Sequence, residues 1–411
     1  MLVLQNNVEI IAGAKKCCIY DLNKGRLYSL DAQDANILVD ILTQGTVSKE
    51  NVPQEYVDYL CANEILVEKE NLCPQIEIKI DPCEVEFAWL EITQNCNLIC
   101  RHCYEGASRT ERKPEMSLKD YRFAIDTLKQ VGVDRIQLVG GEPLMHSRIT
   151  QLIEYVKGKF SFIEIFTNGT LLTDELLELM KNSGVSLALS VYSEKPALHD
   201  YVTRVNGSYD KTYAHIKKAL DKGIQVRIAS VEMKGIPKPS IRCFDVPQRS
   251  DLPRLTGRAS MALYNRDMLR RKLITKDTFK SPIFAEDYYR NKVVHNCFGN
   301  QFYIDYSLDV YPCAMERRMR YGNLRSGKIS EIINNQWTKF TKDKIEGCKD
   351  CEYRYACFDC RSDANQAPVN AKPWYCTYNP FAGEWEDVET FMDALLPDGM
   401  NKNMEYISPE D

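Results

Sequence analysis

Three closely spaced cysteines, Cys96, Cys100 and Cys103, are the residues of this sequence that point most directly to chemistry. A cubane [4Fe–4S] cluster carries one cysteine thiolate on each of its four irons when the protein closes it completely. The CxxxCxxC spacing supplies three thiolates and leaves one iron open, and an open coordination position is typical of a catalytic metal site. Spacing alone also permits a zinc knuckle or three unrelated buried thiols.

A second group of cysteines lies in residues 297–376, which contain few apolar runs. Because such a segment builds little hydrophobic core, bound metal often staples its fold. Iron–sulfur clusters and zinc ions both fit this pattern. The seven cysteines of the group are Cys297, Cys313, Cys348, Cys351, Cys357, Cys360 and Cys376.

The composition is that of a globular protein rich in cysteine, with 411 residues, a net charge of −5 and sixteen cysteines. No stretch approaches the about 18 apolar residues of a membrane helix, and the first residues lack a signal-peptide pattern, so we expect a cytoplasmic protein without a membrane partner. Thiols stay reduced there, which favours metal or redox chemistry over disulfides. The negative charge argues against a nucleic-acid partner. The other cysteines are interpreted as buried or inert thiols, with Cys243 as an alternative fourth cluster ligand.

Apolar strands alternate with amphipathic helices over residues 84–260, which predicts an α/β fold with a parallel sheet or barrel. The expected strands are 87–92, 135–139, 162–167, 186–192 and 225–230, and the expected helices are 118–131, 148–159, 173–183 and 209–222. Chemistry in such folds lies at the carboxyl ends of the strands. Residues 231–240 are too short and proline-rich for a crossover helix. We therefore expect the fifth barrel helix to be missing and the sixth strand, over 241–246, to be displaced.

Residues 1–75 form a separate domain by their pattern. A hairpin is expected at 16–21 and 26–31, around Asn23-Lys24-Gly25. Two short helices follow, one carrying Ala35, Ile37, Leu38 and Ile41 and the other Tyr56, Val57, Leu60 and Ile65. After the barrel we expect a cysteine-rich domain over 261–385, beginning with a basic helix at 261–280, and a C-terminal tail over 386–411.

The cysteine loop, followed by Tyr104 after the first strand of a β/α series, resembles the radical S-adenosylmethionine (SAM) superfamily. The resemblance implies a partial (β/α)6-type barrel and a SAM-binding [4Fe–4S] cluster on the three loop cysteines. The second strand ends in Gly140-Gly141-Glu142-Pro143, similar to the family motif that holds the methionine amine of SAM. Glycine permits a close backbone approach, and a carboxylate suits an ammonium group.

Three further residues match SAM contacts of that family by position. Asn168 and Ser190 stand at the ends of the third and fourth strands, where the family places residues near the ribose. Arg204 is similar to an arginine that pairs with the methionine carboxylate. Taken singly, each is also an ordinary turn residue, strand-end hydroxyl or surface cation.

The C-terminal cysteines resemble the SPASM extension of radical SAM peptide maturases, which carries two auxiliary [4Fe–4S] clusters. By that resemblance the first cluster takes three thiolates and the second takes four; the first set is Cys297, Cys313 and Cys360, and the second is Cys348, Cys351, Cys357 and Cys376. Segments 257–259 and 321–324 are similar to pieces of the same pattern.

Two departures from the SPASM pattern bear on this assignment. Leu308 stands where most relatives have glycine, so we expect a different hairpin there. Cys357 and Cys360 are separated by two residues rather than three, which puts the assignment of Cys360 in doubt.

The first 75 residues are similar to the winged-helix-like leader-recognition domains of peptide maturases, which bind a leader as an added strand. A generic winged-helix scaffold is the alternative. The resemblances together imply an enzyme that generates a 5′-deoxyadenosyl radical and modifies a ribosomally made peptide, forming a thioether or another side-chain crosslink. Its partners would be a precursor peptide with a leader and an external electron donor of the flavodoxin or ferredoxin type.

Two other functions stay open at this point. One is a formylglycine-forming sulfatase maturase of the same superfamily, which the N-terminal domain argues against. The other is a non-enzymatic iron–sulfur electron carrier, which gains nothing from a SAM pocket. No catalytic acid or base is identified from the sequence.

Overall fold

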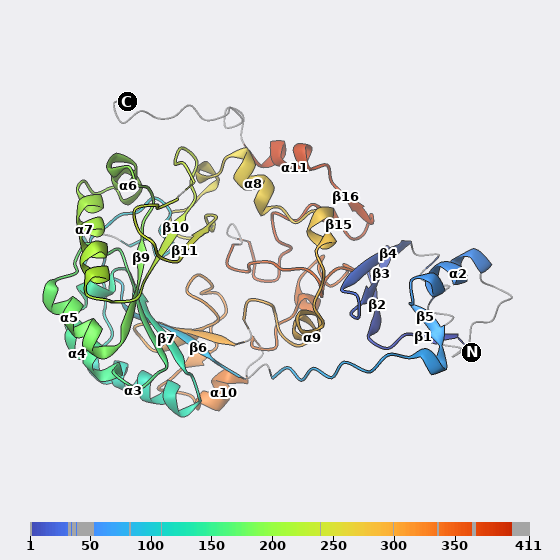
Figure 1. The fold of residues 1–411 in the computed structure, drawn as a ribbon, viewed down its shortest axis with the longest axis horizontal. Coiled ribbons are helices and arrows are strands. Elements are labelled where there is room, and N and C mark those ends of the chain that lie inside the picture. The colour runs from blue at the N-terminus through green and yellow to red at the C-terminus, as the bar shows by residue number, and fades with distance from the viewer. Residues whose placement is uncertain are drawn as a thin grey trace.

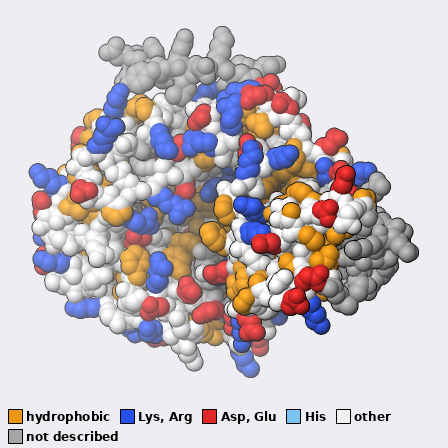
Figure 2. Space-filling view, turned by 45° about the vertical axis from the view of Figure 1, so that its right-hand side comes forward, with side chains coloured by type: hydrophobic (Ala, Val, Ile, Leu, Met, Phe, Trp, Pro, Cys, Tyr) orange, Lys and Arg blue, Asp and Glu red, His pale blue; other side chains and the backbone are white. Residues whose placement is uncertain are grey.

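The computed structural model describes residues 2–31, 34, 38, 53–81, 84–107, 109–238, 240–298, 300–334, 337–363 and 367–396. The cysteine-rich C-terminal part lies between the barrel sheet and the N-terminal domain (Figure 1). On the face drawn in Figure 2, hydrophobic side chains gather around a hollow near the middle. Within the described residues, no helix is long and apolar enough to cross a membrane.

The N-terminal domain is built on a three-stranded antiparallel sheet. Strand β3 (Lys16–Asp21) pairs with β2 (Val8–Ala12) on one side and with β4 (Arg26–Asp31) on the other. The predicted hairpin is confirmed with the expected bounds, and Gly25 takes the left-handed conformation (φ 65°) that its turn requires. Strand β1 (Leu2–Leu4) pairs with β5 (Leu66–Glu68), which precedes the short turn η1 (Lys69–Asn71).

Helix α2 (Gln54–Ala62) is the second of the two predicted N-terminal helices. It buries Val57 and Leu60, and Ile65 is buried beyond its end. The first predicted helix lies outside the described residues except for Asp34 and Leu38.

The barrel sheet consists of six parallel strands that are neighbours in chain order. They are β6 (Phe87–Thr93), β7 (Arg135–Gly140), β8 (Phe162–Thr167), β9 (Val185–Ser190), β10 (Val226–Val231) and β11 (Gln248–Asp251). The helices between them are α3 (Leu118–Gln130), α4 (Ile149–Val156), α5 (Asp174–Ser183), α6 (Pro196–Thr203) and α7 (Ser208–Asp221). The predicted α/β fold is thereby confirmed.

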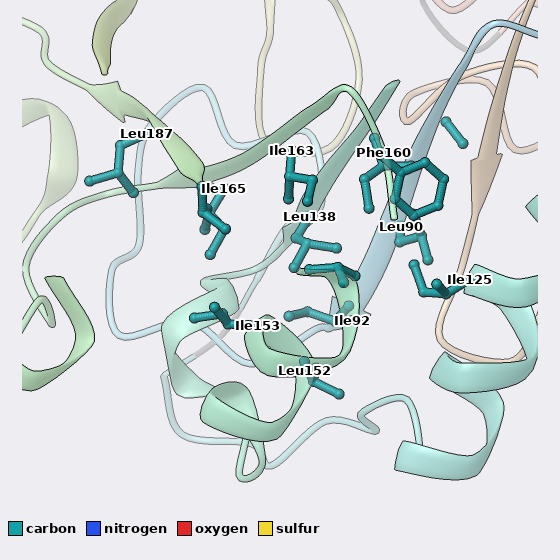
Figure 3. Packing of buried hydrophobic residues seen from close by; sticks show 14 of the residues in the cluster. Leu90, Ile92, Ile125, Leu138, Leu152, Ile153, Phe160, Ile163, Ile165 and Leu187 are labelled. Atoms are coloured by element: carbon teal, nitrogen blue, oxygen red, sulfur yellow. The ribbon is translucent and has the colours of Figure 1, made fainter. Parts of the chain in front are cut away.

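Alternation along the strands separates the core from the barrel interior. Leu90 and Ile92 of β6 pack with Leu138 of β7 and with helix residues such as Ile125 and Leu152 (Figure 3). Each fully buried aliphatic side chain of this kind stabilises the fold by about 1.5–3 kcal/mol. The intervening residues of these strands point to the opposite face, where the barrel holds buried polar side chains.

The crossover after β10 lacks a helix, as predicted from its length. The described residues between Val231 and Gln248 contain none. The sixth strand, however, is β11, which pairs directly with β10. The prediction of a displaced strand over residues 241–246 is therefore wrong. Ile241 is buried in the barrel core as part of a loop, and its backbone N–H donates to Gln248 Oε1 at 3.1 Å.

The C-terminal part extends the barrel sheet on its other side. Strand β12 (Gln301–Ile304) pairs in parallel with β6, and β13 (Asp309–Tyr311) and β14 (Gly322–Asn323) follow in antiparallel order. The other elements are α8 (Arg266–Lys272), α9 (Ala285–Val293), α10 (Ile329–Ile333), β15 (Tyr378–Asn379), β16 (Glu384–Trp385) and α11 (Val388–Leu395).

Two expectations for this part need correction. The long helix expected over 261–280 is divided into η3 (Met261–Leu263), α8 and η4 (Lys276–Lys280), because Asn265 and Thr275 each start a new cap. The segment expected as a tail contains α11, which buries Met392 in a cluster with Leu269 of α8. Arg266 of α8 also pairs with Glu389 of α11.

Candidate functional site

The cysteine loop follows β6 at the carboxyl end of the barrel sheet. Burial raises the pKa of Cys96 to about 12 and holds that of Cys100 well above its ordinary value. Negative charge on the neighbouring loop thiols raises the pKa of Cys100 further. The thiols of Cys96, Cys100 and Cys103 therefore lie close to one another, and all three residues are half-buried. An all-thiolate donor set of this kind fits an iron–sulfur cluster.

Gly140 and Gly141 bring the second strand's loop against the cysteine loop. A Cβ atom on Gly140 would lie 2.1 Å from the carbonyl oxygen of Thr93, and one on Gly141 would lie 2.4 Å from that of Asn95. The backbone N–H of Gly141 donates to Thr93 O at 2.8 Å, and that of Glu142 donates to Asn95 O at 2.7 Å. These glycines thus allow the loop after β7 to pack directly against the backbone just before Cys96.

Glu142 is fully buried and joins the ends of β7 and β8. Its carboxylate accepts hydrogen bonds from Thr167 Oγ1 (2.6 Å), the N–H of Asn168 (2.8 Å) and the N–H of Leu144 (3.1 Å). Burial raises the pKa of Glu142 to about 6, although these three donors act in the opposite direction. Pro143 is also buried and starts the turn η2 (Pro143–Met145). A contact of Glu142 or Pro143 with SAM stays a prediction.

Asn168 connects the end of β8 to the cysteine loop. Its Nδ2 donates to Asn97 Oδ1 at 2.9 Å, and Asn97 Nδ2 donates to Thr170 Oγ1 at 2.7 Å. Thr170 Oγ1 in turn donates to Asn168 Oδ1 at 2.7 Å, which closes the ring of three side chains. These hydrogen bonds fix the side chain of Asn168 against the cysteine loop, and its contact with the ribose of SAM stays a prediction.

Ser190 and Arg204 lie at the ends of β9 and α6. Ser190 is half-buried and hydrogen-bonded to Tyr192. Arg204 is exposed and takes the left-handed conformation (φ 58°). The carbonyl of the preceding Thr203 accepts from the N–H of Ile99 at 3.1 Å, so Arg204 stands beside the cysteine loop. Both SAM contacts stay predictions.

A buried polar cluster beside the loop was missed by the sequence reasoning. Tyr303 OH donates to Glu91 Oε2 at 2.6 Å, and Arg317 Nη2 donates to Glu91 Oε2 (2.9 Å) and Glu105 Oε1 (2.8 Å). Burial raises the pKa of Glu105 to about 7, and the charge of Glu91 adds to this. Burial also raises the pKa of the adjacent Tyr104. The available signal was the alternation in residues 87–93, which separates Glu91 from the core face.

Cys297, Cys313 and Cys360 come together in the C-terminal part. The S–H of Cys297 donates to the Cys360 thiolate, which lowers the pKa of Cys360 to about 5, and the positive charge of Arg254 acts in the same direction. Burial raises the pKa of Cys313 to about 11. Cys360 thus lies with Cys297 and Cys313 despite its short separation from Cys357.

The other four cysteines of this part line one cavity: Cys348, Cys351, Cys357 and Cys376. Burial raises the pKa of Cys376 to about 11, and the charge of Cys357 raises it further. No three His, Cys, Asp or Glu side chains in the described part of the chain lie close enough together for a single metal ion. The four thiols surround a cavity instead, and as a donor set they fit a closed four-iron cluster.

The hairpin between β12 and β13 keeps the backbone that favours glycine, although Leu308 occupies the position. Its φ is 72°, and its side chain is buried in the barrel core. A non-glycine residue in this conformation costs about 1–3 kcal/mol. Burial of a leucine side chain returns a similar amount, so the two terms offset each other. Leu308 thus takes a glycine-like backbone conformation and packs its side chain into the core, and a difference from the hairpin of relatives stays a prediction.

Two protein-family models match the chain. Residues 90–245 match the radical SAM superfamily, and residues 297–352 match SPASM, an iron–sulfur cluster-binding domain. The first match covers the barrel from β6 to beyond β10, and the second begins at Cys297.

Two curated proteins illustrate the relationship. The antilisterial bacteriocin subtilosin biosynthesis protein AlbA of Bacillus subtilis (strain 168) is 35% identical over 144 residues, which cover 34% of this chain and 32% of AlbA. The chain thus aligns with about a third of that relative. An AdoMet-dependent heme synthase of Nitratidesulfovibrio vulgaris (Hildenborough) is 28% identical over 342 residues, which cover 71% of this chain and 92% of the synthase.

Among solved structures, Streptococcus suis SuiB bound to its precursor peptide SuiA has a TM-score of 0.56 with this chain at 15% sequence identity. The superposition covers 91% of this chain and 99% of SuiB, and at this identity it is a likeness of fold. The chain therefore contains a radical SAM domain followed by a SPASM domain. The chain belongs to the radical SAM enzymes that carry a SPASM domain, and its cofactors are SAM and [4Fe–4S] clusters.

Proposed function

We propose that this enzyme modifies a ribosomally made precursor peptide and forms a thioether or another side-chain crosslink. SAM, bound at a reduced [4Fe–4S] cluster on Cys96, Cys100 and Cys103, would supply a 5′-deoxyadenosyl radical that removes a hydrogen atom from the substrate. The protein's task is to hold this site in place and dry. Gly141, Glu142 and Asn168 hold it in place, because their hydrogen bonds join the ends of β6, β7 and β8 to one another and to the cysteine loop.

The observation that carries the proposal is the N-terminal sheet and its place in the fold. Among the described strands, β2 and β4 each pair only with β3, so the sheet has two edges without a strand partner, and pairing with such an edge is how a peptide is bound as an added strand. The sheet also contacts the loop that holds Cys351. The N–H of Ala14 donates to Asp350 O at 2.7 Å, and Tyr20 OH donates to Glu352 O at 2.8 Å. A leader bound at this sheet would be anchored beside the cluster-binding part of the enzyme.

The C-terminal cysteines have two roles in this proposal. Cys297, Cys313 and Cys360 would hold the first auxiliary cluster, and this cluster would bind a substrate thiolate or accept the second electron. The second cluster, on the four cysteines of the cavity, would be closed and would staple the segment. An external electron donor of the flavodoxin or ferredoxin type, in the cytoplasm, would reduce the SAM-binding cluster.

The names of two related proteins support a peptide substrate. SuiB is described with a precursor peptide, and AlbA is a bacteriocin biosynthesis protein. The heme synthase aligns over almost its whole length, and this favours a tetrapyrrole as the second candidate substrate. The N-terminal domain argues against the sulfatase-maturase alternative, and membership in an enzyme family argues against the electron carrier.

Binding measurements separate these substrates. Fluorescence anisotropy with the precursor peptide encoded beside the gene should show tighter binding of the full-length peptide than of the same peptide without its leader. Free leader should compete for the site, and a porphyrin should not. Equal affinity for full-length and leaderless peptide, or competition by the porphyrin alone, would count against the proposal.

A further inference from the structure

The segment after β11 returns to the cysteine loop and packs against its backbone. A Cβ atom on Gly257 would lie 2.3 Å from the carbonyl oxygen of Cys103 and 2.4 Å from that of Tyr104. The backbone N–H of the next residue, Arg258, donates to Cys103 O at 3.0 Å. Only a glycine at 257 permits this approach, so the position of Arg258 is set by the cluster loop itself.

The guanidinium of Arg258 spans the loop from one side to the other. Its Nε donates to the carbonyl of Cys100 at 2.9 Å, and its Nη1 donates to the carbonyl of Ala107 at 2.7 Å. The remaining nitrogen, Nη2, is buried and has no hydrogen-bond partner. A buried donor of a charged group that stays unpaired costs more free energy than one of a neutral group, so this nitrogen favours an acceptor.

The charge of Arg258 also reaches the thiols. It acts to lower the pKa of both Cys96 and Cys100, against the larger effect of burial. Because Arg258 bonds to the carbonyls of Cys100 and Cys103, the guanidinium lies beside the loop where the predicted cluster and SAM would add negative charge. Hydrogen bonds between an ionised donor and an ionised acceptor are short and strong, which suits the free Nη2.

We propose that Arg258 is a positioning residue for the SAM-binding cluster, which fixes the cysteine loop through two carbonyls and donates its free Nη2–H to a negatively charged acceptor at the cluster. Two acceptors share this chemistry, namely a cluster or thiolate sulfur and the carboxylate of SAM. A hydrogen bond to sulfur raises the reduction potential of an iron–sulfur cluster. A bond to the carboxylate would instead strengthen the binding of SAM.

The test uses the reconstituted full-length enzyme and the variants Arg258→Met and Arg258→Lys. Arg109→Met is the matched control, because Arg109 is exposed and lies in the same connection after the cysteine loop. Three quantities are measured for each protein. They are the iron content, the midpoint potential of the cluster whose EPR signal responds to SAM, titrated in the absence of SAM, and the dissociation constant of SAM by equilibrium dialysis. The control should match the unaltered enzyme in all three.

Two results would support the proposal and identify the acceptor. A lower SAM-free potential in Arg258→Met assigns the bond to sulfur. An unchanged potential with about tenfold or greater weakening of SAM binding assigns it to the carboxylate. Potential and SAM affinity both unchanged in Arg258→Met would overturn the proposal. If Arg258→Met fails to assemble its cluster, the same measurements on Arg258→Lys test the proposal. Lysine keeps the positive charge but lacks the three fixed donors of a guanidinium. A potential and a SAM affinity that both equal those of the unaltered enzyme would overturn the proposal in that variant as well.

Discussion

Substituting Gly141 with alanine tests how closely the second strand's loop must fit the cysteine loop. The added Cβ would lie 2.4 Å from the carbonyl oxygen of Asn95 and 2.7 Å from that of Gln94, and both are backbone atoms. An ordinary contact of this kind begins at about 3.4 Å. The two loops must therefore separate by about 1 Å, because neither backbone can turn aside as a long side chain could.

That displacement has two costs. It breaks or lengthens the 2.7 Å hydrogen bond from the N–H of Glu142 to Asn95 O, which contributes about 1 kcal/mol. Overpacking of this size destabilises a fold by about 1–3 kcal/mol in total, so most of the chain should stay folded. A reacting geometry that is displaced by about 1 Å, by contrast, loses about a hundredfold in rate.

The assay is the rate of 5′-deoxyadenosine formation by anaerobically reconstituted enzyme with dithionite and SAM. Gly141→Ala should lose about two orders of magnitude in rate while circular dichroism and total iron change little. Gly327→Ala is the control, because a Cβ atom there would lie 3.7 Å from its nearest neighbour. A Gly141→Ala rate within twofold of the unaltered enzyme would refute the packing argument.

Three further predictions follow from the same geometry. Changing Cys96, Cys100 and Cys103 to alanine should leave a folded protein with about eight of about twelve irons and no 5′-deoxyadenosine formation, as measured by iron analysis and chromatography; retained SAM cleavage would contradict the ligand assignment. Removing Cys348 and Cys351 should lower the melting temperature more than that triple change, because their segment has little apolar core; an equal loss would contradict the proposed stapling role. Burial raises the pKa of Glu142 from 4.5 to about 6, so the folded state binds this proton more tightly than the unfolded state. This difference adds roughly 2 kcal/mol to the free energy of unfolding below about pH 4.5, and the contribution is lost as the pH rises through about 6. Glu142→Gln should accordingly flatten the pH dependence of the melting temperature between about pH 4.5 and 6, and unchanged curves would show that this carboxyl does not titrate as described.

The sequence predicted best those features whose pattern lies within one continuous segment. The strands from β6 to β10 were predicted because each buries an alternating apolar face, and the cysteines stood out by spacing. The sixth strand was not, because its four residues, Gln248–Asp251, are polar and show no alternation. Ile241 looked like a strand residue, yet its side chain fills the core from a loop. Helix α6 was missed because eight residues that begin with proline are too short to show a helical period.

The surroundings of the cysteines were harder to predict because they come from distant segments. Arg258 follows the last barrel strand, and Arg317 belongs to the SPASM segment, yet both bond to the loop region of Cys100 and Glu105. Arg317 stands in no motif, and the resemblance of segment 257–259 to the SPASM pattern did not show that Arg258 bonds to the cysteine loop. Only the folded backbone brings these charges together, so the structure was needed to find them.

The proposal that this enzyme modifies a peptide is tested most directly by the mass of the precursor after anaerobic turnover. With SAM, a reductant and the full-length precursor, 5′-deoxyadenosine should accumulate, and the precursor should lose two hydrogen atoms for each crosslink formed. The leaderless peptide should react far more slowly. An unchanged precursor mass, with SAM cleaved and a porphyrin substrate altered instead, would contradict the peptide assignment and leave the radical SAM chemistry in place.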